Sequence, residues 1–349
     1  MPIVGTCTEM CPHEEHVMRS RTKRLHFIER HSQQSVKEYA RCAAGSTRSP
    51  KELRTPDALV KTTHFLVSLL NFEHHDNNLL ATTNFITDRL RAVRQDIIIQ
   101  QLPPHFGISI IQQIVRYHIL VQYLLHQQPP TSFDPVLNDQ LLRSYLSDLM
   151  EYYQLLPIEE NLKHQVDEFK SYQLLLNIHD QAFIQRLLID FFEESSSVLR
   201  LKEPSCRFQT VFSLYLSWSS GNFYRFFKKC HGLSFLESCC LLEHFTTIRV
   251  HFLDVLSAGF QSKHFKFNLE KMQDWFCFDN EKDLYEFLKH FNLPFDENNK
   301  QVNFQQKKTF QLESRSDRFD LIRKCTYIKL IENSRELESK NYTQVILPT

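Results

Sequence analysis

Residues 86–97, with the sequence ITDRLRAVRQDI, decide the fold class of the chain. Apolar side chains recur here every three or four residues, at Ile86, Leu90, Val93 and Ile97. This spacing places them on one face of an α-helix, whereas a half-buried strand would alternate apolar and polar residues. Prolines at positions 103 and 104 end the pattern, because proline cannot continue a helix from its interior. The stretch therefore predicts a long amphipathic helix.

Another helix is predicted directly upstream. Thr55 can cap it, Pro56 suits its first position, and Asp57 favours the positive end of the helix dipole. Its buried face continues at helical spacing through Leu59, Thr62, Leu66, Leu69 and Leu70. Residues 1–55 form a polar, basic segment before it, and a helix over 14–30 in this segment would have only a thin apolar stripe.

Downstream of residue 104 the helical pattern continues. Stripes at 111–123 and 141–152 are bounded by prolines, and further helices are predicted over 162–177, 181–200, 206–219 and 222–230. Successive helices with short links stack as antiparallel pairs, so residues 56–233 predict a TPR-like or PCI-like helical solenoid. The chain has only 6 glycines, which favours helices over an open α/β sheet with its glycine-rich turns.

The pattern changes at about residue 234. A helix ending near Gly259 is followed by a short extended stretch at 264–267 and by helices over 268–276 and 280–291. Apolar residues then flank a polar turn at 296–300, which predicts a β-hairpin. Helix, strand, helix, helix and hairpin is the order of a winged-helix domain, which we assign to residues 234–312. Residues 313–349 are predicted to form a polar tail with a short helix, at the amphipathic stretch 321–331.

Composition restricts the classes of function. Lys and Arg together number 41, as do Asp and Glu, so any attraction to nucleic acid must be local. The 9 cysteines are odd in number and scattered, which is typical of reduced thiols in an intracellular protein. No apolar run approaches the roughly 20 residues of a membrane helix. We therefore expect a soluble intracellular protein that makes no membrane contact.

Four residues near the N-terminus superficially resemble a zinc site, namely Cys7, Cys11, His13 and His16. Three residues separate the two cysteines, whereas zinc knuckles favour two, and no second half-site follows. We expect these side chains to pack the N-terminal segment, with no metal. The sequence also lacks a Gly-rich phosphate loop, an HExxH motif and a nucleophile elbow. It therefore predicts no enzyme, no cofactor and no small-molecule substrate.

Five charged residues accompany the apolar stripe of residues 86–97: Asp88, Arg89, Arg91, Arg94 and Asp96. Contact between the arginines and phosphate groups is one interpretation. Arginine and aspartate within one helical turn more often join neighbouring elements through buried ion pairs. We favour this structural role.

The predicted winged helix contains candidates for nucleic-acid contact. Its helix over 280–291 carries Glu281, Asp283 and Glu286, which argues against base-specific reading of DNA. Lysines in this region can contact phosphates without reading bases, and the candidates are Lys289, Lys300, Lys307 and Lys308. A plain solvated surface is an equally good interpretation of any one of them.

An aromatic cluster precedes this region and comprises Phe223, Arg225, Phe226 and Phe227. Core packing where the helical arm meets the winged helix is the default interpretation of the three rings. A stripe that binds a partner protein is the alternative.

Several ordered motifs resemble those of the GANP/SAC-three family of mRNA-export scaffolds. They are GTCTEMCP at 5–12, VKEYARCAAG at 36–45, LRTP at 53–56, DRLRAVRQD at 88–96, EFKSY at 168–172 and GNFYRFF at 221–227. The resemblance implies a TPR-like helical region followed by a winged helix.

The same resemblance implies a non-enzymatic scaffold subunit of a TREX-two-type export complex. Such a subunit pairs with a PCI-domain protein and the small acidic DSS-one subunit, and the adjacent winged helices bind RNA. The expected location is the nucleus and cytoplasm. The alternative is a centrosome- or spindle-associated scaffold that acts in centrosome duplication and cell division.

Overall fold

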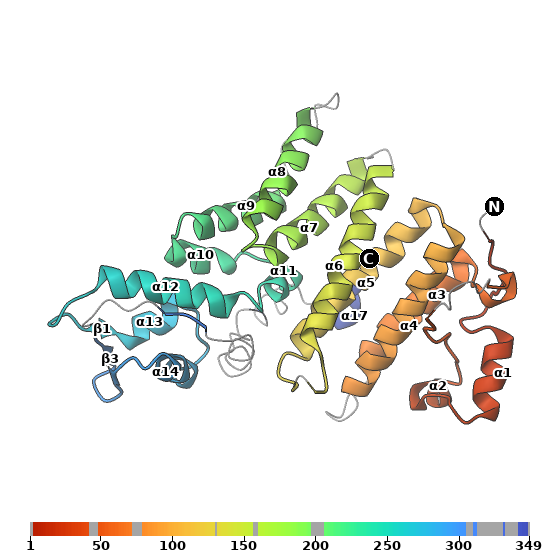
Figure 1. Ribbon diagram of the computed structural model, residues 1–349, viewed down its shortest axis with the longest axis horizontal. Helices are drawn as coiled ribbons and strands as arrows, with labels where there is room; N and C mark the ends of the chain where they lie inside the picture. Colours follow the sequence, from red (N-terminus) through yellow and green to blue (C-terminus); the bar gives the residue numbers. More distant parts are fainter. Residues whose placement is uncertain are drawn as a thin grey trace. The chain divides into compact units, whose positions relative to one another are not determined.

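The computed structural model describes residues 3–41, 48–71, 79–129, 131–155, 160–196, 206–304, 310–312, 331 and 341–347. Within these residues the chain is mainly helical, which confirms the predicted fold class at that level (Figure 1). The chain divides into two compact units, Met1–Ile158 with Lys340–Thr349, and Glu159–Ser339. This division falls inside the predicted 56–233 arm. Among the described helices, none is both long and apolar enough to cross a lipid bilayer.

The first unit is built around α5 (Pro104–Leu124). It packs along α6 (Pro135–Leu155) and also contacts α3 (Pro56–Ser68) and α4 (Leu79–Gln100). Most of α5 is buried because it has neighbours on several sides. The start of α3 is as the sequence predicts: the Thr55 side chain accepts a hydrogen bond from the N–H of Ala58 at 3.3 Å.

The N-terminal segment forms two short helices instead of one helix over 14–30. These are α1 (His13–Arg21) and α2 (Phe27–Ser32), and Lys23 between them has a left-handed φ of 55°. His26 and Glu29 form a capping box, so α2 begins as a helix separate from α1. Before α1, residue Cys7 pairs with Arg54 in a parallel bridge beside the 3₁₀ helix η1 (Pro50–Glu52).

The C-terminal helix α17 (Tyr342–Ile346) belongs to the core of the first unit. It packs on α5, α3 and the 3₁₀ helix η2 (Leu69–Asn71), with Val345 and Ile346 buried. The Thr343 hydroxyl donates to the carbonyl of Val67 at 3.3 Å. This short helix therefore completes a helical core in which its direct neighbours, α5, α3 and η2, lie more than two hundred residues earlier in the sequence. The predicted amphipathic stretch around 321–330 lies outside the described residues.

The second unit begins with helices that agree with the predicted ones to within a few residues. They are α7 (Glu160–Leu176), α8 (Gln181–Ser196), α9 (Cys206–Ser219) and α10 (Phe223–Cys230). The short helix α11 (Phe235–Cys240) follows and is not among the predicted helices. α7 packs against α8, α9 and α11, and α9 packs against α10. Gly221 provides the break before α10 with a φ of 70°, and the Asn222 side chain caps that helix by accepting from the N–H of Arg225.

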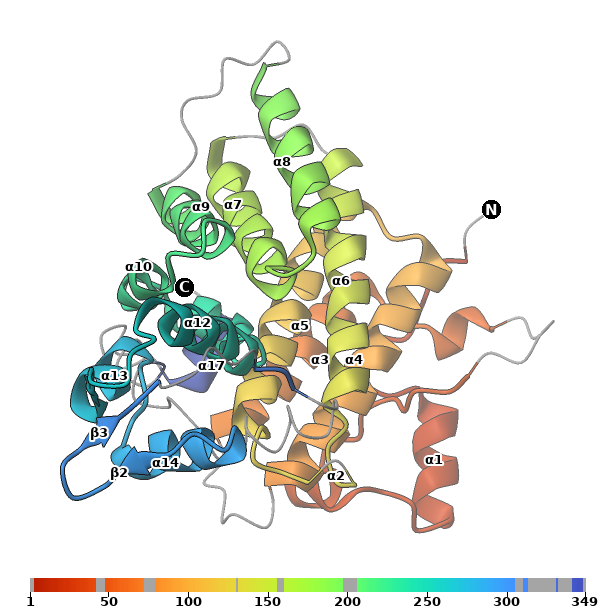
Figure 2. The ribbon, with the colours of Figure 1, turned by 60° about the vertical axis from the view of Figure 1, so that its left-hand side comes forward.

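Residues 245–302 of the second unit form a small α/β module. Its elements follow in the order α12 (Phe245–Gly259), β1 (Phe267–Asn268), α13 (Leu269–Trp275), α14 (Glu281–His290), β2 (Phe295–Asp296) and β3 (Gln301–Val302). Figure 2 shows β2 and β3 beside α14. The strands form an antiparallel sheet in the order β1-β3-β2, with Val302 opposite both Phe267 and Phe295. Asparagines at the N-caps of α13 and α14 begin both helices.

A buried arginine stabilises this module from within. Arg249 of α12 is fully buried, and its Nε and Nη2 donate to the carbonyls of Phe276 and Cys277 at 2.9 and 2.6 Å. The guanidinium carbon lies 3.8 Å from the centroid of the Phe278 ring. These contacts satisfy carbonyls at the end of α13, which have no partner within that helix.

Candidate functional site

Buried ion pairs join the N-terminal segment to α4. Asp96 of α4 accepts a hydrogen bond from Lys37 Nζ at 2.6 Å and from Arg54 Nε at 2.7 Å. All three side chains are essentially removed from water. Because a buried charge is costly without a partner, each of the three depends on the other two.

A second group of charges lies around Arg19 and Arg89. Arg19 of α1 pairs with Glu29 at 2.6 Å, and both side chains are fully buried. Arg89 of α4 pairs with Asp88 and also reaches Glu38 at 3.2 Å. The two arginines thus share carboxylates from α2 and from the segment that follows it.

The remaining charged residues of α4 face other parts of the first unit. Arg94 forms a two-bond pair with Asp148 of α6, at 2.6 and 3.0 Å. Arg91 lies over the Tyr39 ring, 4.0 Å from its centroid. The structure therefore brings all five residues, Asp88, Arg89, Arg91, Arg94 and Asp96, into intramolecular contacts. Their geometry is that of a structural network.

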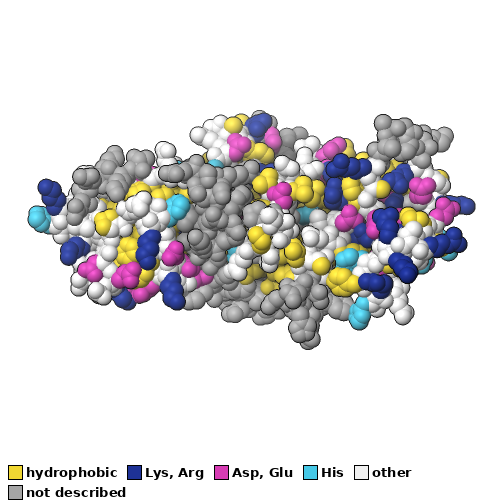
Figure 3. Space-filling model, turned by 60° about the horizontal axis from the view of Figure 1, so that its bottom comes forward, with side chains coloured by type: hydrophobic (Ala, Val, Ile, Leu, Met, Phe, Trp, Pro, Cys, Tyr) yellow, Lys and Arg dark blue, Asp and Glu magenta, His cyan; other side chains and the backbone are white. Residues whose placement is uncertain are grey.

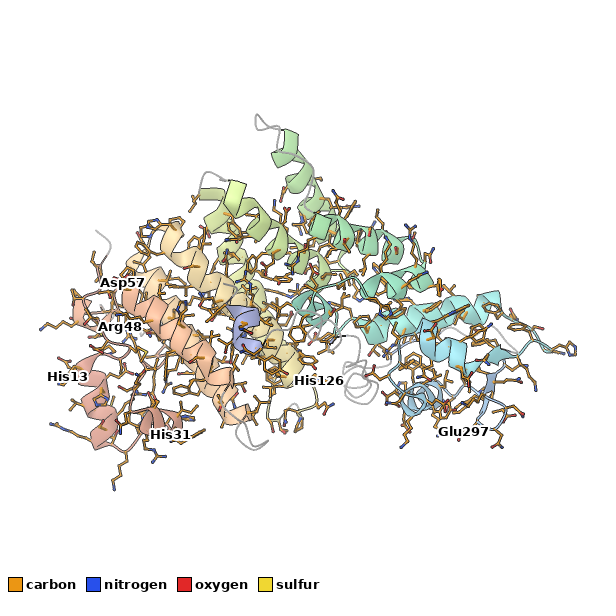
Figure 4. The ribbon with its side chains drawn as sticks, turned by 180° about the vertical axis from the view of Figure 1, so that it is seen from behind. His13, His31, Arg48, Asp57, His126 and Glu297 are labelled. Atoms are coloured by element: carbon orange, nitrogen blue, oxygen red, sulfur yellow. The ribbon has the colours of Figure 1, made fainter. Side chains whose placement is uncertain are left out.

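The four zinc-like residues lie at or beside an open hollow of about 550 Å³ lined by 6–11, 33–35 and parts of α1. Burial raises the pKa of Cys11 to about 12 and also raises the pKa of Cys7 above its ordinary value. Protonated thiols are poor metal ligands and poor nucleophiles. His13 is exposed (Figure 4), while His16 bonds to the Ser35 hydroxyl at 2.8 Å. In the described part of the chain, no three such residues converge as metal ligands.

Lys300 lies at the end of the β2–β3 turn and is engaged by two carboxylates. Its Nζ is 2.7 Å from Glu281 of α14 and 3.0 Å from Glu270 of α13. These hydrogen bonds raise the pKa of Lys300 and lower the pKa of Glu281. This lysine therefore links the turn to both helices. Because the two carboxylates offset its positive charge, it is poorly suited to binding a phosphate.

Lys289 has a weaker intramolecular engagement. Its Nζ is 3.6 Å from Glu297, which Figure 4 places in the β2–β3 turn, and 5.9 Å from the centroid of the Phe295 ring. Both charged side chains are more than half exposed, so water screens this pair. Lys307 and Lys308 lie outside the described residues.

The rings of the aromatic cluster are part of the core. Phe223, Phe226 and Phe227 are buried, whereas Arg225 between them is exposed. Phe223 and Phe227 both contact Phe252 of α12, so the cluster continues from α10 into the module. The default interpretation, packing between the helical region and the module, describes their position.

Exposed rings and cations elsewhere in the second unit escaped the sequence-based predictions. Phe265 lies in the loop between α12 and β1, and its sequence neighbours Lys263, His264 and Lys266 are exposed as it is. Figure 3 shows dark-blue and cyan side chains gathered around this loop, at the left of the view. The sequence SKHFKF at 262–267 carries the signal, because aromatic residues between basic ones are typical of nucleic-acid contact surfaces.

These features define a mainly helical protein whose second unit contains a small α/β module. Residues 10–297 match the SAC3/GANP family, and the chain belongs to that family. The resemblance seen in the ordered sequence motifs is thereby confirmed.

Three relatives illustrate the extent of the similarity. Protein xmas of Drosophila melanogaster is 26% identical over 313 residues, which cover 84% of this chain and 15% of that protein. SAC3 family protein 1 of Schizosaccharomyces pombe is 25% identical over 363 residues, which cover 98% of this chain and 35% of that protein. SAC3 family protein B of Arabidopsis thaliana is 27% identical over 285 residues, which cover 74% of this chain and 16% of that protein. The chain thus spans only 15% to 35% of the lengths of these relatives.

Proposed function

We propose that this protein is a non-enzymatic scaffold subunit of an mRNA-export complex of the TREX-two type. Membership of the SAC3/GANP family over residues 10–297 is the observation that carries the proposal. In this role the chain binds a PCI-domain protein, a small acidic DSS-one-like subunit and RNA. It acts in the nucleus and cytoplasm.

The module of α12 to β3 is, in this proposal, a winged helix. Its element order and the β1-β3-β2 sheet support this assignment, with α13 and α14 as the helical pair and the β2–β3 hairpin as the wing. α14 is the helix that would enter a DNA groove, yet it exposes or half-exposes Glu281, Asp283 and Glu286. Such a face repels phosphates, so the module holds RNA by surfaces other than α14.

The helices before the module are, in this proposal, a TPR-like or PCI-like solenoid. The packing of α7 with α8 and α9, and of α9 with α10, supports it, because helical solenoids are built from such pairs of successive helices. The continuous aromatic core between α10 and α12 then fixes the winged helix to the end of the solenoid. A partner with the same two-part architecture can bind alongside.

Affinity purification of the tagged full-length chain tests the proposal. The chain is recovered from interphase and mitotic human or insect cell extracts, and bound proteins are identified by mass spectrometry. We expect a PCI-domain protein and a small acidic subunit in amounts comparable to the chain. Recovery of centrosome or spindle proteins without a PCI-domain protein would refute the export role and favour the mitotic alternative.

Asp96→Asn and Asp139→Asn are a matched pair of variants for this purification. Asp96 lies in the buried network, whereas Asp139 makes an exposed pair with Arg143 at 2.8 Å. Loss of partners in the first variant alone would show that binding needs the N-terminal segment in place. Equal recovery by both variants would show that partner binding does not depend on the buried network around Asp96.

A further inference from the structure

A continuous row of aromatic rings runs across the second unit. Tyr224 of α10 contacts Trp275 of α13 with 5.2 Å between ring centroids, and Trp275 contacts Phe267 at 5.3 Å. Phe267 contacts Phe260 at 5.1 Å, and Phe260 stacks on Phe265 at 5.2 Å. Tyr224 and Phe265, at the two ends of the row, are 47% and 45% exposed. Flat aromatic surface is therefore available to a ligand at two separated points.

Exposed lysines accompany these rings. Lys228 follows Tyr224 by one helical turn on α10, and Lys271 precedes Trp275 by one turn on α13, so each shares a face with its ring. Lys263 lies two residues before Phe265. We call the six residues Lys228, Tyr224, Trp275, Lys271, Phe265 and Lys263 the basic–aromatic strip.

The lysines of the strip differ from those that the sequence pointed to. Within the described residues, Lys228, Lys263 and Lys271 form no ion pair, whereas Lys289 and Lys300 are both engaged by carboxylates. Arg225 and Lys266, also exposed and without an ion pair in the same residues, flank the strip.

The acidic residues nearest the strip do not cancel this charge. Lys300 is shared between Glu270 and Glu281, so one of these two negative charges is not balanced, and Asp274, next to Trp275, is an exposed acid of α13. The three lysines of the strip, together with Arg225 and Lys266, outnumber these two negative charges. Positive charge therefore remains in excess around the rings.

We propose that the basic–aromatic strip binds single-stranded RNA, with Tyr224 and Phe265 stacking on bases and the lysines contacting phosphates. The inference rests on the proposed function and locates its RNA contact. Every base has a face that can stack on an aromatic ring, so such a surface binds single strands with little sequence preference. In a duplex the base faces are covered by their neighbours, and the rings have nothing to stack on.

The composition of the strip favours RNA over a partner protein. Aromatic residues are common in protein interfaces, but lysine is depleted from their cores. Here each ring of the strip has an exposed lysine two or four residues away in the sequence. An interface that buried them would have to remove from water three ammonium groups that pair with no carboxylate among the described residues.

Fluorescence anisotropy of the full-length chain with a labelled oligouridine tests the proposal. We expect Phe265→Ala and Tyr224→Ala each to weaken binding by about fivefold or more, the size of one lost base stack. The matched control is Phe27→Ala, which removes an exposed ring of α2 in the first unit. Each test ring is only about half exposed and contacts a neighbouring ring, so we expect either substitution to lower stability by about 0.5–1.5 kcal/mol, which thermal unfolding measures and which leaves the chain folded in the binding assay. An abasic oligomer of the same length should bind every variant alike, because it has no bases to stack.

Salt dependence provides a second measurement on the same variants. Replacing Lys263 or Lys271 with alanine should reduce the slope of log Kd against log salt by about 0.7 each, the value for one lost single-strand phosphate contact. The control Lys51→Ala removes an exposed lysine of the first unit and should leave the slope unchanged.

The outcomes separate the strip from the broader proposal. If the unaltered chain binds oligouridine but the ring variants match Phe27→Ala, the strip is refuted while RNA binding stands. If the unaltered chain binds no RNA, the strip is refuted, and co-purification of the PCI-domain partner still decides the scaffold role. If Phe265→Ala instead abolishes binding of a protein partner without affecting RNA affinity, the strip is a protein interface and the inference is wrong.

Discussion

Replacing Asp96 with asparagine should release the N-terminal segment from the first unit. The substitution keeps the side-chain volume but removes the charge that Lys37 and Arg54 contact at 2.6 and 2.7 Å. Both cations then remain buried with an uncharged neighbour whose amide group can also point a donor at them. Removing one partner of a buried pair typically costs about 3–5 kcal/mol, and we expect a loss in this range.

Hydrogen exchange detects this loss where it arises. The N–H groups of Cys7 and Thr55 bond to the carbonyls of Leu53 and Cys7, so their exchange reports how often the segment opens. In Asp96→Asn these amides should exchange at least about a hundredfold faster, which corresponds to about 3 kcal/mol. Asp139→Asn, which breaks an exposed pair on α6, should change stability by less than about 1 kcal/mol. Equal protection in the two variants would refute a stabilising role for the network.

Three further predictions follow from other buried features. Gly5→Ala should destabilise the first unit by about 1–3 kcal/mol in urea unfolding, because a Cβ at Gly5 would lie 2.6 Å from a backbone oxygen. In the control Gly259→Ala the added Cβ meets no atom within 4 Å, so this variant should be neutral or stabilising. Burial lowers the pKa of His118 to about 4, so folding favours its neutral form, and the stability that this adds is present above pH 6.5 and is lost as the pH falls. Between pH 7 and pH 5 the unaltered chain should therefore lose about 2 kcal/mol more stability than His118→Gln. An equal loss in the two proteins would contradict this. Arg249→Met should destabilise the second unit by about 3 kcal/mol, since two carbonyls lose a charged donor, and an unchanged thermal unfolding curve would exclude this role.

Local signals explain why most helices were predictable. Adjacent residues determine the break at Gly221, the cap at Asn222 and the helix that follows. The same holds for α13 and α14, whose asparagine caps and apolar faces are contiguous in sequence. The predicted hairpin also agrees with β2 and β3, because its polar turn separates two apolar segments.

Contacts between distant residues were not predictable in the same way. Lys300 has few acids near it in sequence, yet its carboxylate partners lie 19 and 30 residues earlier, on helices that the fold brings to it. Likewise, α17 docks against Val67 across 276 residues, so the C-terminal segment could be predicted only as a tail. The charged residues of α4 were identified, but most of their partners lie in the N-terminal segment and on α6.

The exposed rings were missed because exposure depends on tertiary structure. Phe265 and Phe267 look alike in sequence, but Phe267 is buried by the sheet and Phe265 is not. The tertiary structure is needed to distinguish the ring that is buried in the core from the ring that is accessible to a ligand.

Ultraviolet crosslinking of RNA to the full-length chain in living cells tests the central claim most directly. Crosslinked peptides are identified by mass spectrometry and mapped onto the sequence. The account predicts crosslinks to polyadenylated RNA that concentrate in residues 223–304, with Tyr224 and Phe265 among the modified positions. Absence of crosslinked RNA, or crosslinks confined to the first unit, would contradict it.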